Sequence, residues 1–353
     1  MRKINLILIL CSALSACGGG GGSANNGTDP NLTSVDPYPY PQAQQYPTPP
    51  VWNLPTDDQI NTTPSTYIAY GSNRSNDVMK LTALVNIDNT HICTATPIHS
   101  DGTGTWLVTT AHCILNKKSN ANTVLSSELV NPATISIETI INGKWNSTQA
   151  QAVYTPKDYC YGATFSELGG CPNFTANQDA GPNAEGNDIA LIYTSGIVGD
   201  PTAYPIIEPQ NQYPQPYTMA PILSVGNGQT DATEYAGTTF YVTNYFYRQT
   251  DEKGYHYIYN SYFENNSTNS GYLNLACSGD SGGGDFFWNG SKWVLLAAHS
   301  FGQKDSCGSR YNYLPTASTD VGSYYNWIMN IINSQTPINT CNDENNNCSS
   351  TSL

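Results

Sequence analysis

Three short motifs contain residue types that could together carry out nucleophilic chemistry. They are TTAHC at 109–113, NDIAL at 187–191 and CSGDSGG at 277–283. A serine hydroxyl is a weak nucleophile at neutral pH and needs an adjacent base, a role that an oriented histidine fills. The motifs therefore predict a site in which His112, Asp188 and Ser281 act together.

Each of these residues also has a structural alternative. The chain has only five histidines, and a lone histidine is more often a hydrogen-bonding residue of the structure than a base. Asp188 could be a turn residue at the start of a strand, and Ser281 a serine in a glycine-rich turn. What argues against these alternatives is the combination of all three motifs in the order His, Asp, Ser.

In this order the motifs resemble the trypsin/chymotrypsin family of serine peptidases, over about residues 68–333. Asp188 matches the family's aspartate because an apolar run follows it directly. The resemblance implies a serine endopeptidase that acts on proteins or peptides through an acyl-enzyme. His112 would be the base, Asp188 would orient it, and the N–H groups of Gly279 and Ser281 would form the oxyanion hole. This chemistry needs no metal and no organic cofactor.

The elements that must position these residues are expected to be short strands. Apolar runs such as TWLV at 105–108, FYV at 240–242 and WVLL at 293–296 are rich in β-branched or aromatic residues and alternate with turn residues, which favours an all-β fold. The family resemblance implies two antiparallel six-stranded Greek-key barrels, the first with His112 and Asp188 and the second with Ser281. A helix is expected at about 324–333, packed on the second barrel, because its apolar residues share one face.

The chain divides into four expected parts. Residues 1–16 resemble a lipoprotein signal peptide, since LSAC at 14–17 resembles a lipobox that would leave Cys17 as a lipidated N-terminus. Residues 17–67 form a low-complexity tether rich in Gly, Pro and Tyr. The peptidase domain is expected over 68–336, and an Asn- and Ser-rich tail over 337–353.

Eight cysteines remain after the signal peptide and the lipidation site, and an even number in an exported chain indicates disulfides. No C-x-x-C pair suggests a zinc site. The family resemblance implies the bridges Cys93–Cys113 and Cys277–Cys307. The remaining expected pairs are Cys160–Cys171, in an inserted loop, and Cys341–Cys348, in the tail.

The resemblance also implies an activation step. In the family, the residue before the serine pairs with an N-terminus that proteolysis creates. Here this residue is Asp280, and IAYG at 68–71 is a degenerate match to the usual new terminus. We therefore hypothesise that cleavage after Tyr67 frees the Ile68 amine to pair with Asp280. The alternative is that Ile68 simply begins the first strand.

The expected substrate pocket leaves two alternatives open. Leu275 stands where trypsin-like enzymes carry an aspartate, so cleavage after Lys or Arg is not expected. The segment Ser300, Phe301, Gly302 resembles the one that pairs with the substrate backbone, which places His299 at the pocket. Leu275 favours an apolar residue before the cut, whereas His299 with Ser278 resembles glutamyl endopeptidases and favours an acidic one; of the two we favour the apolar pocket.

The charge of the chain bears on its partners and location. With 13 Lys+Arg against 27 Asp+Glu the net charge is −14, which makes nucleic acid an unlikely partner. The expected partners are protein or peptide substrates, an activating protease, and a membrane through a lipid anchor only. We expect an exported protein, anchored at the outer membrane or cell surface or released from it. The alternative function is a non-catalytic surface-binding homologue of a protease.

Overall fold

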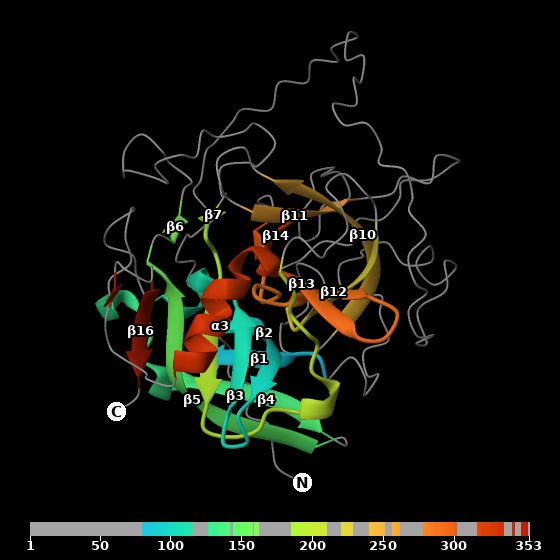
Figure 1. The fold of residues 1–353 in the computed structure, drawn as a ribbon. Coiled ribbons are helices and arrows are strands. Elements are labelled where there is room, and N and C mark those ends of the chain that lie inside the picture. The colour runs from blue at the N-terminus through green and yellow to red at the C-terminus, as the bar shows by residue number, and fades with distance from the viewer. Residues whose placement is uncertain are drawn as a thin grey trace, which may run out of the picture. The chain divides into compact units, whose positions relative to one another are not determined.

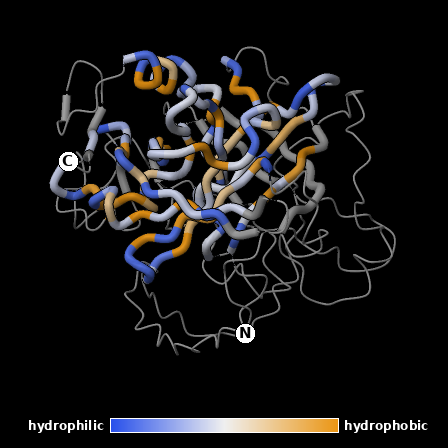
Figure 2. The backbone as a smooth tube through the Cα atoms, turned by 90° about the horizontal axis from the view of Figure 1, so that it is seen from below, coloured by the Kyte–Doolittle hydropathy of each residue, from blue (hydrophilic) through white to orange (hydrophobic). Residues whose placement is uncertain are grey.

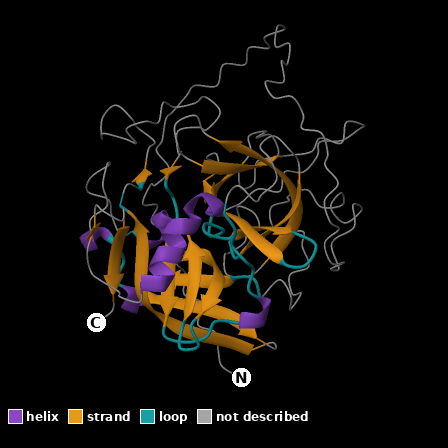
Figure 3. Ribbon diagram, viewed as in Figure 1, coloured by secondary structure: helices purple, strands orange, loops and turns teal. Residues whose placement is uncertain are grey.

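The computed structural model describes twelve stretches of the chain, and these contain mostly β-strands (Figure 3). They are residues 80–115, 126–141, 144–157, 159–161, 185–209, 220–228, 240–250, 256–261, 278–301, 316–334, 341–342 and 347–351. Polar residues interrupt the apolar stretches at many of the turns, as Figure 2 shows along the backbone.

Six strands form the first barrel. They are β1 (Ala83–Ile87), β2 (His91–Ser100), β3 (Thr105–Thr109), β4 (Ile135–Ile141), β5 (Lys144–Pro156) and β8 (Ala190–Thr194). Neighbours pair antiparallel in the order β5-β4-β1-β2-β3-β8. The long strand β5 closes the ring, because residues 144–149 pair with β4 and residues 150–154 pair with β8.

The second barrel is also closed and antiparallel. Its strands are β9 (Ala220–Gly226), β10 (Phe240–Thr250), β11 (His256–Ser261), β12 (Gly284–Trp288), β13 (Trp293–Phe301) and β14 (Thr316–Asp320). They pair in the order β10-β11-β14-β13-β12-β9 (Figure 1). In both barrels the strands, counted along the chain, follow the spatial order first, second, third, sixth, fifth, fourth. This shared Greek-key order confirms the predicted fold class.

Shorter elements connect and extend the barrels. They are the 3₁₀ turns η2 (Ala111–Ile114), η3 (Ser126–Glu128), η4 (Pro132–Thr134), η5 (Pro201–Ala203) and η7 (Val321–Tyr324), and the paired short strands β6 (Cys160–Tyr161) and β7 (Glu185–Gly186). The tail contributes β15 (Cys341–Asn342) and β16 (Asn347–Thr351). Strand β16 pairs with β5, so the described part of the tail extends the sheet of the first barrel.

The predicted helix is α3 (Tyr325–Ser334), and its buried face is the apolar stripe of the sequence. Ile328, Ile331 and Ile332 are buried in one cluster with Trp106 of the first barrel and Phe286 of the second. In Figure 1 the helix lies across the strands of the first barrel. The expectation that α3 packs on the second barrel was incomplete, because this apolar cluster belongs to both barrels.

Several expectations fall outside the described residues. These include the signal peptide, Cys17, the tether and Ile68. Within the described stretches, no helix has the length and apolar character that crossing a membrane requires.

Candidate active site

His112 lies in the short turn η2, which follows strand β3 directly. The next residue, Cys113, forms a disulfide with Cys93 of β2, with 6.3 Å between the two Cα atoms. This is one of the bridges that the resemblance implies, and it ties the histidine turn to the neighbouring strand. The sulfur atoms lie close to His112 but are bonded to each other, so this cluster is not a metal site.

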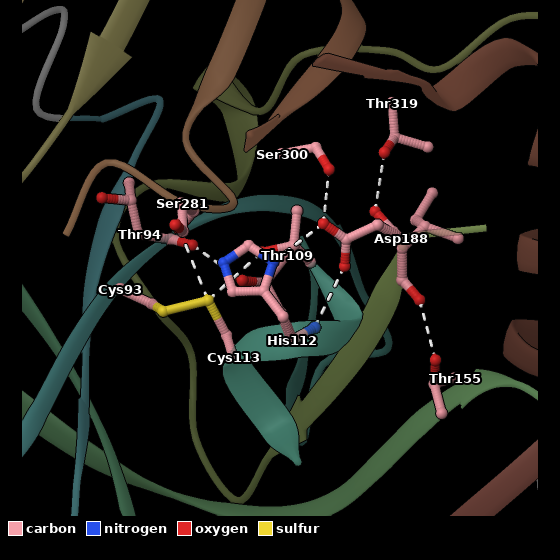
Figure 4. A network of polar contacts seen from close by, with 12 residues as sticks. Cys93, Thr94, Thr109, His112, Cys113, Thr155, Asp188, Ser281, Ser300 and Thr319 are labelled. Atoms are coloured by element: carbon pink, nitrogen blue, oxygen red, sulfur yellow. Dashed lines mark hydrogen bonds and ion pairs between the residues drawn. A yellow bond between two sulfur atoms is a disulfide. The ribbon is translucent and has the colours of Figure 1, made fainter. Parts of the chain in front are cut away.

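Asp188 is completely buried and faces His112 (Figure 4). Its Oδ2 lies 2.8 Å from His112 Nδ1, and its Oδ1 accepts a hydrogen bond of 3.0 Å from the His112 backbone N–H. Ser300 Oγ donates a further bond of 2.5 Å to Oδ2. Because a carboxylate is an acceptor at both oxygens, these contacts fix the orientation of both side chains.

The surroundings of Asp188 keep its carboxyl group ionised. Burial by itself raises the pKa of a carboxyl group, but the charge interaction with His112 and the hydrogen bonds from His112 and Ser300 outweigh it. The net result is a pKa for Asp188 below its ordinary value of 3.8. A negative carboxylate is the form that holds the imidazole in place and stabilises its protonated state.

This lowered pKa predicts a loss of stability in acid. The unfolded chain takes up a proton on Asp188 at its ordinary value, whereas the folded chain does so only at lower pH. The contribution of Asp188 is thus present above about pH 4 and is lost as the pH falls through the folded pKa. We expect the difference in unfolding free energy between wild type and Asp188→Asn to shrink from pH 7 to pH 2 in denaturant titrations. A constant difference would contradict the assignment.

The backbone around Asp188 is held by residues of both barrels. Asn187 has a φ of +55°, a left-handed conformation that Asn tolerates better than most residues, and Tyr324 Oη donates to its Oδ1 at 2.6 Å. Thr319 Oγ1 of β14 donates to the Asp188 carbonyl at 2.8 Å. Thr155 of β5 donates to the next carbonyl, that of Ile189, at 3.1 Å. These bonds place a first-barrel aspartate against the second barrel.

Ser281 lies in the turn between Ser278 and β12, beside the histidine turn. The Thr94 N–H donates to the Ser281 carbonyl at 2.8 Å, and Cys113 Sγ lies 3.8 Å from the same oxygen. Thr94 Oγ1 also donates to the Gly279 carbonyl at 2.9 Å. The serine loop of the second barrel is therefore attached to strand β2, next to the disulfide of the first barrel. Figure 4 shows Ser281, His112 and Asp188 together in this region.

The glycines of the serine loop are required by its geometry. Gly279 and Gly282 have φ values of +94° and +79°, which disfavour a side chain. A Cβ on Gly282 would lie 2.1 Å from Thr109 Oγ1. Within the described part of the chain, no carbonyl accepts from the N–H of Gly279 or Ser281, whereas the Gly282 and Gly283 N–H groups donate to the carbonyls of His299 and Asp280.

Ser300 reaches Asp188 because of a β-bulge in strand β13. His299 pairs with Ser318 of β14, and Phe301 pairs with Ala317, so Ser300 has no partner in that register. A bulge redirects a side chain. Here the Ser300 hydroxyl, buried to 7% exposure, bonds the aspartate of the other barrel. From the sequence, Ser300 is expected only in the substrate-binding segment.

Removal of this hydroxyl is expected to weaken the His112–Asp188 pair. A hydrogen bond to a charged group is worth about 1.5–3 kcal/mol, and we expect Ser300→Ala to lower kcat/KM about tenfold through kcat. The measurement is steady-state hydrolysis of a peptide amide, with Ser195→Ala, an exposed serine after β8, as the matched control. An unchanged kcat in Ser300→Ala would contradict this role.

Asp280 is buried, and its carboxylate lies against the backbone that follows β9. Its Oδ1 accepts from the Gly228 N–H at 2.7 Å. A Cβ on Gly226 would lie only 2.0 Å from that oxygen, so glycine is needed at this contact. The expected partner Ile68 lies outside the described residues, and the activation pair stays a prediction.

The other expected site residues are only partly described. Ser278 is exposed at the start of the serine loop, and Phe301 is the last residue of β13. Cys341 and Cys348 are direct backbone partners in the β15–β16 pair, and Cys160 lies in β6. The remaining expected site residues lie outside the described stretches: Leu275, Gly302, Cys171, Cys277 and Cys307.

Sequence reasoning missed several residues that position the site. Thr94 donates to the serine loop and Thr109 donates to the Thr94 carbonyl. Thr319 and Tyr324 hold the segment that contains Asp188. Thr94 follows Cys93 directly, which is the one sequence signal that could have drawn attention to it. The fold brings Thr109, Thr319 and Tyr324 to the site, and no local motif predicts these contacts.

Two Greek-key barrels with a His–Asp pair and a glycine-flanked serine between them define a trypsin-like protease fold. The family profile described as Trypsin matches residues 165–328, a range that includes Asp188 and Ser281 but not His112. Over these residues the chain is similar to the trypsin/chymotrypsin-like family.

Other comparisons add little to this assignment. Among solved structures, the chain is similar to the scabies mite inactivated protease paralogue S-D1, with 18% identity and a TM-score of 0.47. The alignment covers 75% of this chain and 97% of the other. No curated protein matches the chain.

Proposed function

We propose that this protein is a serine endopeptidase in which His112, Asp188 and Ser281 form the catalytic triad. One observation carries the proposal: His112 Nδ1 lies 2.8 Å from a carboxylate that is completely buried and has further donors on both oxygens. A pair held in this way directs the other imidazole nitrogen, Nε2, away from the aspartate, where it can accept a proton.

The mechanism follows from these positions. Ser281 Oγ attacks the carbonyl carbon of the scissile bond while His112 Nε2 takes its proton, which gives a tetrahedral oxyanion. The N–H groups of Gly279 and Ser281 stabilise this oxyanion. His112 then gives its proton to the leaving amine, and water repeats the sequence to release the acyl group from Ser281.

Protein and peptide substrates are what the protease family implies. The pocket is non-tryptic in this proposal, since Leu275 offers no charge to a Lys or Arg side chain. The residue before the cut is then apolar or acidic.

Labelling by a serine-directed fluorophosphonate tests the proposal. The soluble domain, with residues 1–17 removed, is compared with its Ser281→Ala variant. Label on wild type alone supports an activated Ser281. If wild type stays unlabelled, the chain is cut before Ile68 and tested again. Label that appears only then supports the pairing of Ile68 with Asp280, and continued silence favours the non-catalytic binding homologue.

The activity is expected to fall in acid because the base must be neutral. Histidine side chains in proteins take up a proton around pH 6–7, whereas the lowered pKa keeps Asp188 ionised through this range. We expect kcat/KM for a peptide amide to drop about tenfold per pH unit below that range. A rate that stays flat down to about pH 4 would contradict His112 as the base.

We also propose that the protein is exported and lipid-anchored through Cys17, with residues 18–67 as a tether. The support is the LSAC sequence at 14–17 and the run of glycines that follows. Metabolic labelling with a fatty acid analogue tests it: wild type should carry the label and Cys17→Ala should not. Mature protein that begins at another residue without lipid would overturn the anchor.

A further inference from the structure

The tail strand β16 pairs with the C-terminal half of β5, on the edge that faces away from β8. Residues 152–156 of β5 lie opposite residues 347–351 of β16, whereas residues 150–154 of β5 lie opposite β8. Thr155 and Pro156 are therefore paired with β16, and within the described part of the chain they have no other strand partner. The place of these two residues in the sheet depends on the tail.

The tail strand is packed into the protein and does not merely lie on its surface. Ser349 is directly opposite Tyr154, so the two side chains share one face of the sheet. Their exposed fractions are only 2% and 4%. Tyr154 in turn lies against Trp106, with 5.6 Å between the ring centroids, in the cluster that also buries helix α3. Strand β16 is thus part of the packed structure of the first barrel.

Thr155 connects this strand pair to the segment that contains Asp188. Its hydroxyl donates to the Ile189 carbonyl at 3.1 Å, and both residues are completely buried. Asp188 and Ile189 come just before β8, and in the described structure neither has a strand partner. Two threonine hydroxyls hold their carbonyls instead: Thr319 of the second barrel holds that of Asp188, and Thr155 of the first barrel holds that of Ile189.

These contacts form a continuous connection from the tail to the candidate active site. Strand β16 holds Thr155 in the sheet, and Thr155 holds the carbonyl that follows Asp188. The Asp188 carboxylate in turn orients His112 through contacts of 2.8 and 3.0 Å. A buried carbonyl that loses its donor is unfavourable, so the segment shifts toward another partner. Such a shift misaligns His112, on whose position proton transfer depends.

We propose that β16 is a positioning element of the active site and that it acts on Asp188 through Thr155. Thr155 is then a positioning residue for the peptidase reaction. The proposal rests on the proposed function, because it concerns the same His112–Asp188 pair. It predicts that activity depends on the tail, although the tail supplies no residue to the proposed mechanism.

The first test compares Thr155→Val, which removes the hydroxyl, with Thr155→Ser, which keeps it. We expect Thr155→Val to lower kcat for a peptide amide about 3- to 10-fold with little change in KM, the range that one neutral hydrogen bond implies. Thr155→Ser should restore most of this loss. A purely structural role predicts the opposite order, because Ser lacks the buried methyl group that Val retains. A kcat of Thr155→Val equal to that of wild type would overturn the role of Thr155.

The second test asks whether the tail acts through Thr155. Deletion of residues 338–353 removes β16 together with both cysteines of the tail, so neither is left as a single thiol. We expect the deletion to lower kcat at least as much as Thr155→Val does. The two changes together should lower it no further than the deletion alone. An unchanged kcat in the deletion, or losses that multiply in the double variant, would overturn the proposal.

Two point variants replace the deletion if that protein does not fold. Alternate residues of an antiparallel strand direct their N–H groups to the partner strand. Of Ser349→Pro and Ser350→Pro, only one therefore loses a bond to β5. That variant should lower kcat, and the other serves as its matched control. Wild-type kcat in both would overturn the proposal.

Hydrogen exchange separates failure of this inference from failure of the proposed function. Exchange of the backbone amides in residues 187–191 is compared by mass spectrometry between wild type and the tail variant. Faster exchange there, with unchanged exchange in β12, supports the coupling whether or not the protein is a peptidase, and equal exchange refutes it. Wild type that takes no fluorophosphonate label, before or after cleavage ahead of Ile68, refutes the peptidase alone.

Discussion

Ser281→Ala is expected to lower kcat/KM by about 10⁵–10⁶-fold, because in the proposed mechanism it removes the hydroxyl that forms the acyl-enzyme. The structure shows how this serine is held in place. The loop that carries Ser281 is held by Thr94 through both its N–H and its hydroxyl, and two glycines with positive φ fix its turn. Progress curves with a peptide amide at high enzyme concentration measure the loss.

The matched control for this prediction is Ser291→Ala, in the exposed turn after β12. It should keep kcat/KM within about twofold, since surface changes away from special features have small effects. Both variants should unfold at the same temperature as wild type. Residual activity of Ser281→Ala above about one hundredth of wild type would mean that another residue is the nucleophile.

Asp188→Asn is expected to lower kcat by about 10⁴-fold while KM changes little. The amide of Asn can donate to His112 Nδ1 and so hold the imidazole in the tautomer that cannot accept the proton of Ser281. In this protein the change also affects the bonds from the His112 N–H and from Ser300, both of which end on the Asp188 carboxylate. The loss should therefore exceed that of Ser300→Ala, which removes one of these bonds.

The control for this variant is Asp200→Asn at an exposed aspartate whose Oδ1 accepts from the Thr202 N–H. An amide oxygen can accept the same bond, so activity and stability should stay close to wild type. Activity is measured across pH, because the wrong-tautomer explanation predicts partial recovery at high pH. An Asp188→Asn variant with more than a tenth of wild-type kcat would show that another group orients His112.

The sequence indicated the residues of the candidate site, but not the residues that hold them in place. His112, Asp188 and Ser281 stand in local motifs, because a disulfide, an apolar strand and a glycine turn must adjoin them. The short apolar runs likewise indicated strands, and their Greek-key arrangement followed from the family resemblance. The prediction of a helix with one apolar face was also correct, since Ile328, Ile331 and Ile332 form the buried face of α3.

The tertiary structure determined several contacts that no local sequence pattern predicts. The helix α3 packs into a cluster shared by both barrels, and the Asn- and Ser-rich tail adds β16 to the edge of β5. Ser300 was expected in the segment that pairs with the substrate backbone, and the structure adds a contact that the sequence did not predict, because a bulge in β13 turns its hydroxyl to Asp188.

By itself the sequence determined which residues could react, because reactivity depends on residue type and immediate neighbours. Only the tertiary structure decided which residues orient them, because Thr94, Thr319 and Ser300 act across more than a hundred positions of the chain. Closure of the barrel also places Asp285 of β12, which no sequence motif indicates, fully buried with its Oδ2 3.6 Å from His299 Nδ1.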